Sequence, residues 1–147
     1  MAQRPIGKID HIGIAVKSIA EARKFFEGAL GATFLYEHAN PEGGFTIVEL
    51  DLNGFVLELL EPLGDDSFLH GFLARRGEGV HHLTLDVPDA KERIAELKSA
   101  GIKMAEEREF APDSYEAFIS PRSSHGVLIQ LGSGYPTLAR AAEWFKR

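Results

Sequence analysis

The 147-residue sequence contains no cysteine. A chain without thiols forms neither disulfides nor thiolate metal sites, so any metal ion has to be held by nitrogen and oxygen ligands. Long apolar runs are absent as well: no segment approaches the roughly 18 consecutive apolar residues of a membrane-spanning helix, and the short polar start is not followed by an apolar stretch. We therefore expect neither secretion nor membrane insertion, and our starting hypothesis is a cytoplasmic enzyme or binding protein.

Positive charge is also scarce. Sixteen lysines and arginines stand against 22 aspartates and glutamates, which gives a formal net charge of −6. Without an overall basic field, general binding to nucleic acid or to an acidic membrane surface is not expected. The content of hydrophobic residues, 44%, and of charged residues, 26%, is that of an ordinary soluble domain with a sizeable core.

The sequence contains one internal repeat. The segments IDHIGIAV and GVHHLTLDV each place an imidazole near the start of an alternating apolar run, and these imidazoles, His11 and His82, are 71 residues apart. Each segment is followed by a helix-capping pattern, at residues 18–21 and 89–92, with the same offset. Self-similarity at a fixed distance indicates two copies of a unit of about 70 residues.

Apolar periodicity and turn residues predict the same order of elements in both copies. In the first copy we expect strands over residues 8–16, 33–37, 45–52 and 55–60 and a helix over 18–29; in the second, strands over 80–87, 102–105, 115–119 and 127–131 and a helix over 90–100. The Asn53-Gly54 pair predicts a tight hairpin. Phe25 and Phe26 are expected to form a buried aromatic face of the first helix.

The predicted fold class is therefore α+β, with two tandem βαβββ modules forming a curved, barrel-like mixed sheet and the helices outside. Module 1 spans about residues 8–63 and module 2 about 79–132. A connector over residues 64–78 contains a short helix, and a further amphipathic helix is expected over 137–147. We expect residues 1–147 to form a single domain.

Two further polar residues interrupt apolar strands at equivalent places. Glu58 lies in FVLELL and Gln130 in VLIQL, 72 residues apart. If a pseudo-twofold axis relates the modules, these side chains converge with His11 and His82. Two imidazoles, a carboxylate and an amide oxygen suit one divalent ion, such as Co, Mn, Ni, Zn or Fe. A carboxylate buried in a sheet costs several kcal/mol unless it is paired or bound to a metal.

The other histidines have weaker cases. Strand alternation turns His81 to the opposite face from His82, which favours a structural or ligand-supporting role. His38, His70 and His125 are expected in surface loops, although His125 lies just before Gly126 and is in reach of a ligand.

These residues resemble the vicinal oxygen chelate superfamily, which includes glyoxalase I, extradiol dioxygenases, fosfomycin resistance proteins and methylmalonyl-CoA epimerase. The segments IDHIGIAV, LELLEPL, RGEGVHH and PRSSHGVLI are similar to those of methylmalonyl-CoA epimerases in particular, and the resemblance covers roughly residues 8–131. It implies a metal-dependent isomerase that deprotonates the carbon α to a metal-chelated thioester or carbonyl. It also implies a small-molecule substrate such as an acyl-CoA, and a homodimer.

The chain departs from the epimerase pattern in two places. The epimerases carry Glu where this chain has Gln130, and that Glu is implicated in both metal binding and proton transfer; a glutamine can ligate through its oxygen but cannot act as a base. Residues 111–116, expected to form a loop, are acidic where the epimerases are glycine-rich and basic near coenzyme A. Either thioesters bind differently here or the substrate is not a coenzyme A ester.

With Gln130 neutral, Glu49 is the candidate general base. It lies on the strand next to that of Glu58, and it points inward if Phe45, Ile47 and Glu49 share a face. A solvent-facing Glu49 is the alternative, with Glu58 or a metal-bound hydroxide as the base.

Three other functions stay open at this point: a glyoxalase I-like lyase, a non-haem Fe(II) extradiol-type dioxygenase, and a metal-free binding or resistance protein. The dioxygenase would use His11, His82 and Glu58 as its iron ligands. It ranks lower, because the extradiol enzymes place their Glu on the final strand, where this chain has Gln130.

Overall fold

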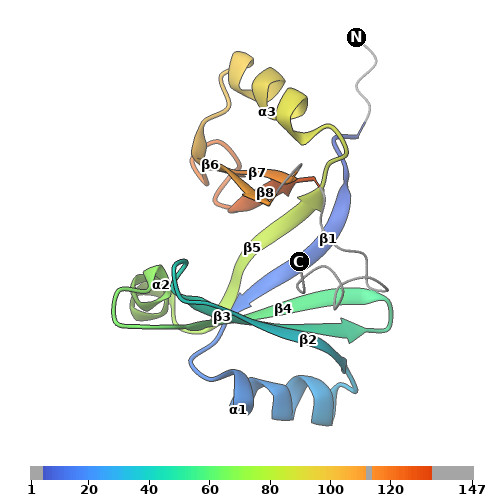
Figure 1. Cartoon of the computed structure of the whole chain (residues 1–147), viewed down its shortest axis with the longest axis vertical. Coiled ribbons are helices and arrows are strands. Elements are labelled where there is room, and N and C mark those ends of the chain that lie inside the picture. Colours follow the sequence, from blue (N-terminus) through green and yellow to red (C-terminus); the bar gives the residue numbers. More distant parts are fainter. Residues whose placement is uncertain (1–4, 112–113, 134–147) are drawn as a thin grey trace. The chain divides into compact units, whose positions relative to one another are not determined.

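The computed structural model describes residues 5–111 and 114–133. Its elements are β1 (Lys8–Ala15), α1 (Ile19–Arg23), η1 (Lys24–Ala29), β2 (Thr33–Asn40), β3 (Phe45–Leu52), β4 (Phe55–Pro62), α2 (Phe68–Arg76), β5 (Gly79–Asp86), α3 (Ala90–Ser99), β6 (Met104–Ala111), β7 (Ser114–Ile119) and β8 (Ile129–Gly132). Across the described residues the strands form one mixed sheet in the order β2-β3-β4-β1-β5-β8-β7-β6 (Figure 1). The α+β class and the repeated strand-helix-strand-strand-strand order are confirmed.

The chain divides into two compact units. Among the described residues, the N-terminal unit consists of residues 12–81, and the C-terminal unit of residues 5–11, 82–111 and 114–133. The boundary passes within β1, between His11 and Ile12, and within β5, between His81 and His82. β1 and β5 are therefore each divided between the two units. The sequence repeat alone does not indicate this division.

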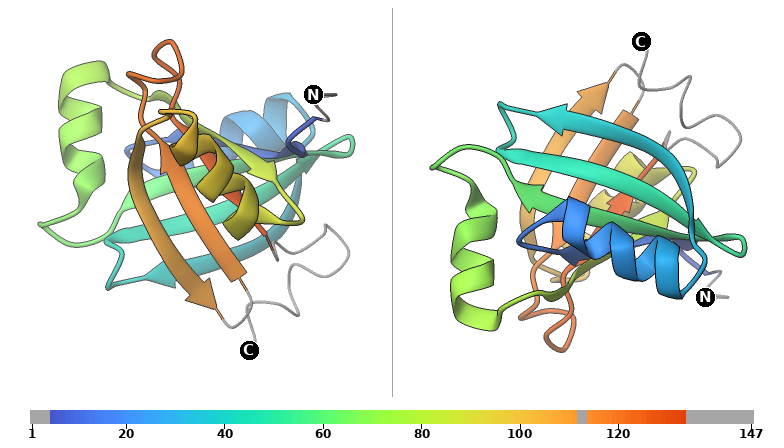
Figure 2. Two further views of the ribbon diagram at one scale, coloured as in Figure 1. Left: turned by 90° about the horizontal axis from the view of Figure 1, so that it is seen from above. Right: turned by 90° about the horizontal axis from the view of Figure 1, so that it is seen from below.

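In the N-terminal unit, β2, β3 and β4 pair antiparallel, and β3 and β4 are joined by the predicted Asn53-Gly54 turn. Both turn residues have positive φ, 54° and 90°, as a type I′ hairpin requires. One face of these strands packs under α1 through residues such as Val48 and Leu50 (Figure 2). The other face packs through Ile47 against α2. Helices therefore cover both faces of β3 and β4, which agrees with the largely continuous apolar sequence of these strands.

The first helix begins as predicted and then changes type. The Ser18 hydroxyl accepts a hydrogen bond from the backbone N–H of Glu21 at 3.2 Å. From Lys24 the α-helix continues as the π-helix η1. Phe26 packs on the core, whereas Phe25 is 55% exposed, so the prediction of a buried aromatic face is wrong for Phe25. The extra residue that a π-turn contains shifts the side-chain positions expected from a 3.6-residue period.

In the C-terminal unit, β8 pairs parallel with β5 and antiparallel with β7, and β7 pairs antiparallel with β6. α3 covers one face of these strands through Ile94, which packs with Ala117 and Leu131 (Figure 2). Polar side chains occupy the opposite face. β7 begins at Ser114, which agrees with the strand predicted over residues 115–119 and contradicts the overlapping loop predicted over 111–116. Burial alternates along β7, with Ser114 and Glu116 inside despite their polar character.

Two expectations concern helices. The helix predicted over residues 137–147 lies outside the described residues. Among the helices of residues 5–111 and 114–133, none has the length and apolar content needed to cross a membrane.

Candidate functional site

Two buried histidines meet in the C-terminal unit. His11 on β1 is 6% exposed and His82 on β5 is 4% exposed. Their rings pack edge to face, with centroids 5.6 Å apart and an angle of 84° between the planes. The ring of His82 also lies 6.4 Å from that of Phe118. The structure thus brings together the two imidazoles that the repeat singled out.

The orientation of His11 is set by its neighbour in sequence. The Asp10 carboxylate lies 2.7 Å from Nδ1 of His11 and accepts a hydrogen bond from it. Metal-binding histidines typically donate their second ring N–H to a carboxylate or carbonyl in this way, which fixes the tautomer. If His11 binds a metal ion, Nε2 is therefore the nitrogen that would ligate it.

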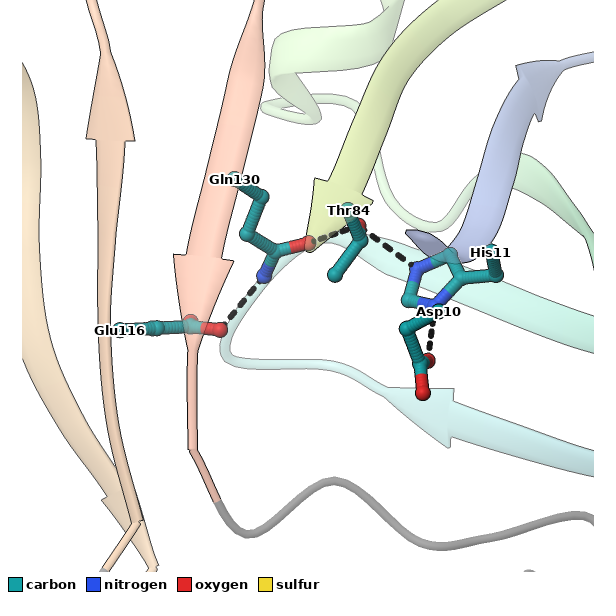
Figure 3. A network of polar contacts seen from close by, with 5 residues as sticks. All are labelled: Asp10, His11, Thr84, Glu116 and Gln130. Carbon is teal, nitrogen blue, oxygen red and sulfur yellow. Dashed lines mark hydrogen bonds and ion pairs between the residues drawn. The ribbon is translucent and has the colours of Figure 1, made fainter. Parts of the chain in front are cut away.

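Nε2 of His11 stands at one end of a row of polar contacts (Figure 3). It lies 2.9 Å from the hydroxyl oxygen of Thr84, and that hydroxyl donates to Oε1 of Gln130 at 2.7 Å. Nε2 of Gln130 donates in turn to Oε2 of Glu116 at 2.5 Å. Arg108 closes the row through an ion pair with Oε1 of Glu116. We call His11, Thr84, Gln130, Glu116 and Arg108 the polar row.

Strand register explains why four of these side chains, those of Thr84, Gln130, Glu116 and Arg108, lie close together. Thr84 and Gln130 are direct partners on β5 and β8, and Arg108 and Glu116 are direct partners on β6 and β7. The residue opposite Glu116 on β8 is Gly132, which has no side chain. The carboxylate of Glu116 therefore reaches Gln130, its diagonal neighbour, a separation that a long side chain spans.

The N-terminal unit holds the two predicted carboxylates. Glu49 on β3 is 3% exposed and Glu58 on β4 is 8% exposed, and they are direct partners in the antiparallel ladder. Ile47, two residues from Glu49, packs with Phe45 in the core on this face, as the sequence analysis required. The solvent-facing alternative for Glu49 is thereby excluded. Two buried carboxylates side by side repel each other unless a cation or a shared proton lies between them.

His81 has a packing role. Its ring lies 4.8 Å from that of Phe72 and 5.7 Å from that of Phe68. Burial lowers the pKa of His81, and the nearby Glu58 carboxylate raises it in part. The uncharged form, which suits an aromatic environment, is therefore the favoured one.

Two of the three remaining histidines differ from expectation. His38 lies on β2 and His70 on α2, so the surface-loop prediction is wrong for both, while His125 lies in the turn before β8. His70 contacts the carbonyl of Gly64 through Nε2 at 2.9 Å.

Four residues of the site were not identified from the sequence. Asp10 is adjacent to His11, and Thr84 is two residues from His82 and so on the same face of β5, so both carried a readable signal. Arg108 and Glu116 did not: Glu116 lies where the predicted strand over residues 115–119 overlaps the predicted acidic loop over 111–116. The cross-strand register that brings it to Gln130 cannot be read from one sequence.

The buried polar residues include side chains of the kinds that bind divalent transition metals. The C-terminal unit contains two imidazoles and the amide oxygen of Gln130, and the Glu58 carboxylate of the N-terminal unit is also buried. Nitrogen and oxygen donors of this kind suit Mn, Fe, Co, Ni and Zn. The carboxylate behind His11 is a further feature typical of such a site.

Comparison with known proteins assigns the family. The uncharacterized protein YqjC of Bacillus subtilis is 37% identical over 128 residues, which covers 86% of this chain and 91% of that protein. The mitochondrial methylmalonyl-CoA epimerase of Bos taurus is 32% identical over 129 residues, covering 86% of this chain and 74% of the relative.

Solved structures agree. The methylmalonyl-CoA epimerase of Mycobacterium tuberculosis matches with a TM-score of 0.81 at 30% identity, over 96% of this chain and 97% of that one. A methylmalonyl-CoA epimerase in complex with methylmalonyl-CoA and NH4+ matches with a TM-score of 0.77 at 30% identity, over 90% and 98%. Residues 10–118 match the Glyoxalase/Bleomycin resistance protein/Dioxygenase superfamily. The chain therefore belongs to this superfamily, which is also called the vicinal oxygen chelate superfamily.

Proposed function

We propose that this protein is a divalent-metal-dependent epimerase that removes and returns the proton α to a thioester or carbonyl group. The observation that carries the proposal is the buried pair of His11 and His82, with His11 oriented by Asp10, in a chain similar to methylmalonyl-CoA epimerases over most of its length. The substrate class is a small molecule, with acyl-CoA thioesters first, because the related epimerases are named for them. We place the enzyme in the cytoplasm, as a homodimer.

The proposed ligands are His11, His82, Glu58 and Gln130. The first three are residue types that commonly bind divalent metals, and all four side chains are buried. A metal bound there supplies Lewis-acid stabilisation of the negative charge that develops on the substrate oxygen during deprotonation. Burial strengthens that stabilisation, because water is excluded from the donors.

Glu49 is the proposed base. Gln130 is neutral and accepts no proton from carbon at its amide, whereas the Glu49 carboxylate does so readily. Its position opposite Glu58 on the ladder places it beside a proposed ligand rather than in solvent. The proton then has to return on the opposite face of the carbon, so hydrogen at that carbon exchanges with solvent.

The experiment begins with elemental analysis of protein purified without added metal or chelator. The Co2+-loaded protein is then incubated with methylmalonyl-CoA in deuterated water, and deuterium at the α carbon is followed by mass spectrometry. We expect exchange in the wild type and a loss of about 10²-fold or more in Glu49→Gln, the usual contribution of a general base. Glu37→Gln is the control, because Glu37 is an exposed glutamate on the neighbouring β2 strand.

The outcomes separate the competing functions. A bound metal without exchange would contradict the epimerase proposal and favour lyase or oxygenase substrates. Absence of metal in the purified and the Co2+-treated protein would favour a metal-free binding or resistance protein. Exchange that is undiminished in Glu49→Gln would move the base to Glu58.

A further inference from the structure

The amide of Gln130 has two chemically different ends, and only one of them can ligate a metal. Its Nε2 donates to Oε2 of Glu116 at 2.5 Å, and its Oε1 accepts from Thr84 at 2.7 Å. A half-turn of the amide leaves its shape unchanged but exchanges the donor with the acceptor. In the reversed state an NH2 group, which has no lone pair for a cation, would face Thr84 and His11.

Glu116 selects between the two states. A carboxylate accepts hydrogen bonds and donates none, so the reversed amide would press its oxygen against a carboxylate oxygen at hydrogen-bond distance. Glu116 is 3% exposed, and little solvent is available to screen this repulsion. The guanidinium of Arg108 donates to the other oxygen of Glu116 and so holds this side chain in place beside Gln130.

We propose that Glu116, held by Arg108, is a positioning residue that turns the oxygen of Gln130 toward Thr84 and the histidines. A glutamine can then serve as an oxygen ligand, because its single amide oxygen is held in the required direction. A carboxylate would need no such help, since both of its terminal atoms are oxygens. The role as a ligand rests on the proposed function; the orientation of the amide does not. A carboxylate at position 130 would stand against Glu116, so the residues at 116 and 130 form a matched pair of one acid and one amide.

The matched pair can be exchanged. In E116Q the contact no longer requires the NH2 group of Gln130, so both amide states become accessible, and we expect the affinity for Co2+ to fall by about 10- to 100-fold. In E116Q/Q130E an amide at 116 can donate to a carboxylate at 130, and the affinity should recover. E106Q is the matched control: Glu106 also pairs with Arg108, at 3.6 Å, but is exposed. Titration calorimetry with Co2+ measures all four proteins.

A second readout requires no metal. The side-chain NH2 signals of Gln130, identified in NMR spectra by their loss in Q130E, should exchange slowly with solvent in the metal-free wild type and in E106Q, and faster in E116Q. Thermal unfolding of each variant verifies that it is folded. Unchanged Co2+ affinity together with unchanged exchange in E116Q would overturn the proposal. A wild type that binds no Co2+ but keeps protected NH2 signals would contradict the proposed function and support the positioning role.

Discussion

Thr84 contacts both His11 and Gln130, which are proposed metal ligands. Removing its hydroxyl tests whether the metal ion and the Thr84 hydroxyl compete for the same two ligand atoms. Thr84 is fully buried, its hydroxyl donates to Gln130 at 2.7 Å, and Nε2 of His11 lies 2.9 Å away on the other side. Thr84→Val keeps the shape of the side chain and deletes both contacts.

The expected cost differs between the two forms of the protein. Without metal, the substitution removes the buried hydrogen bond to Oε1 of Gln130 and the polar contact with Nε2 of His11. Leaving these groups poorly satisfied should cost about 1–3 kcal/mol in total, which corresponds to a lower Tm by roughly 3–10 °C for a chain of this size. With metal bound, Nε2 of His11 and Oε1 of Gln130 are engaged by the ion, and the cost should fall to about 1 kcal/mol or less.

Thermal unfolding followed by circular dichroism, with excess chelator and with saturating Co2+, measures this difference. We expect the metal to raise the Tm of Thr84→Val more than that of the wild type. Thr33→Val, at an exposed position of β2, is the control and should behave as the wild type in both conditions. An equal loss of stability with and without Co2+ would refute the reasoning, because the hydroxyl contacts would then persist beside the metal or the metal would bind elsewhere.

Three further predictions test separate parts of the structure. His11→Ala and His82→Ala should each lose the bound metal but keep the native circular dichroism spectrum; a full equivalent of metal in both, by elemental analysis, would contradict the ligand assignment. Leu50→Ala should lower the free energy of unfolding in urea by about 2–5 kcal/mol, since Leu50 is fully buried in the core under α1; a loss well below 1 kcal/mol would show that this core repacks. Burial, and then the nearby Asp10 carboxylate, raise the pKa of Asp86. Above the pKa that Asp86 has in the unfolded chain, its negative charge therefore destabilises the folded protein. Asp86→Asn should raise the Tm at pH 7 but not below about pH 3.5. An equal gain at both pH values would show that charge is not the cause.

Much of the fold was readable from the sequence, because alternation and turn chemistry are local. The strands at residues 45–52 and 55–60 follow from apolar runs around an Asn-Gly pair, and the observed β3 and β4 agree closely with them. The sequence repeat also singled out His11 and His82, which the structure brings into contact. These features depend either on residues that are close together in the chain or on the internal sequence repeat.

Features that depend on several strands at once were not predictable. Glu116 lies where the predicted acidic loop overlaps the predicted strand over residues 115–119. Neither prediction indicates that its side chain contacts Gln130, which depends on a glycine being the residue opposite it on β8. The exposure of Phe25 depends on the π-helix η1, which the spacing of apolar residues in the sequence does not predict. The division of β1 and β5 between the two units depends on contacts across the sheet.

Deuterium exchange at the α carbon of methylmalonyl-CoA tests the central claim most directly. Wild-type protein is compared after chelation and after loading with Co2+, at equal concentration in deuterated water. We predict rapid incorporation of one deuterium with the loaded protein and a background rate with the chelated protein, restored by adding Co2+. Equal rates in both forms would contradict metal dependence, and a background rate in both, despite stoichiometric metal, would contradict epimerase activity on this thioester.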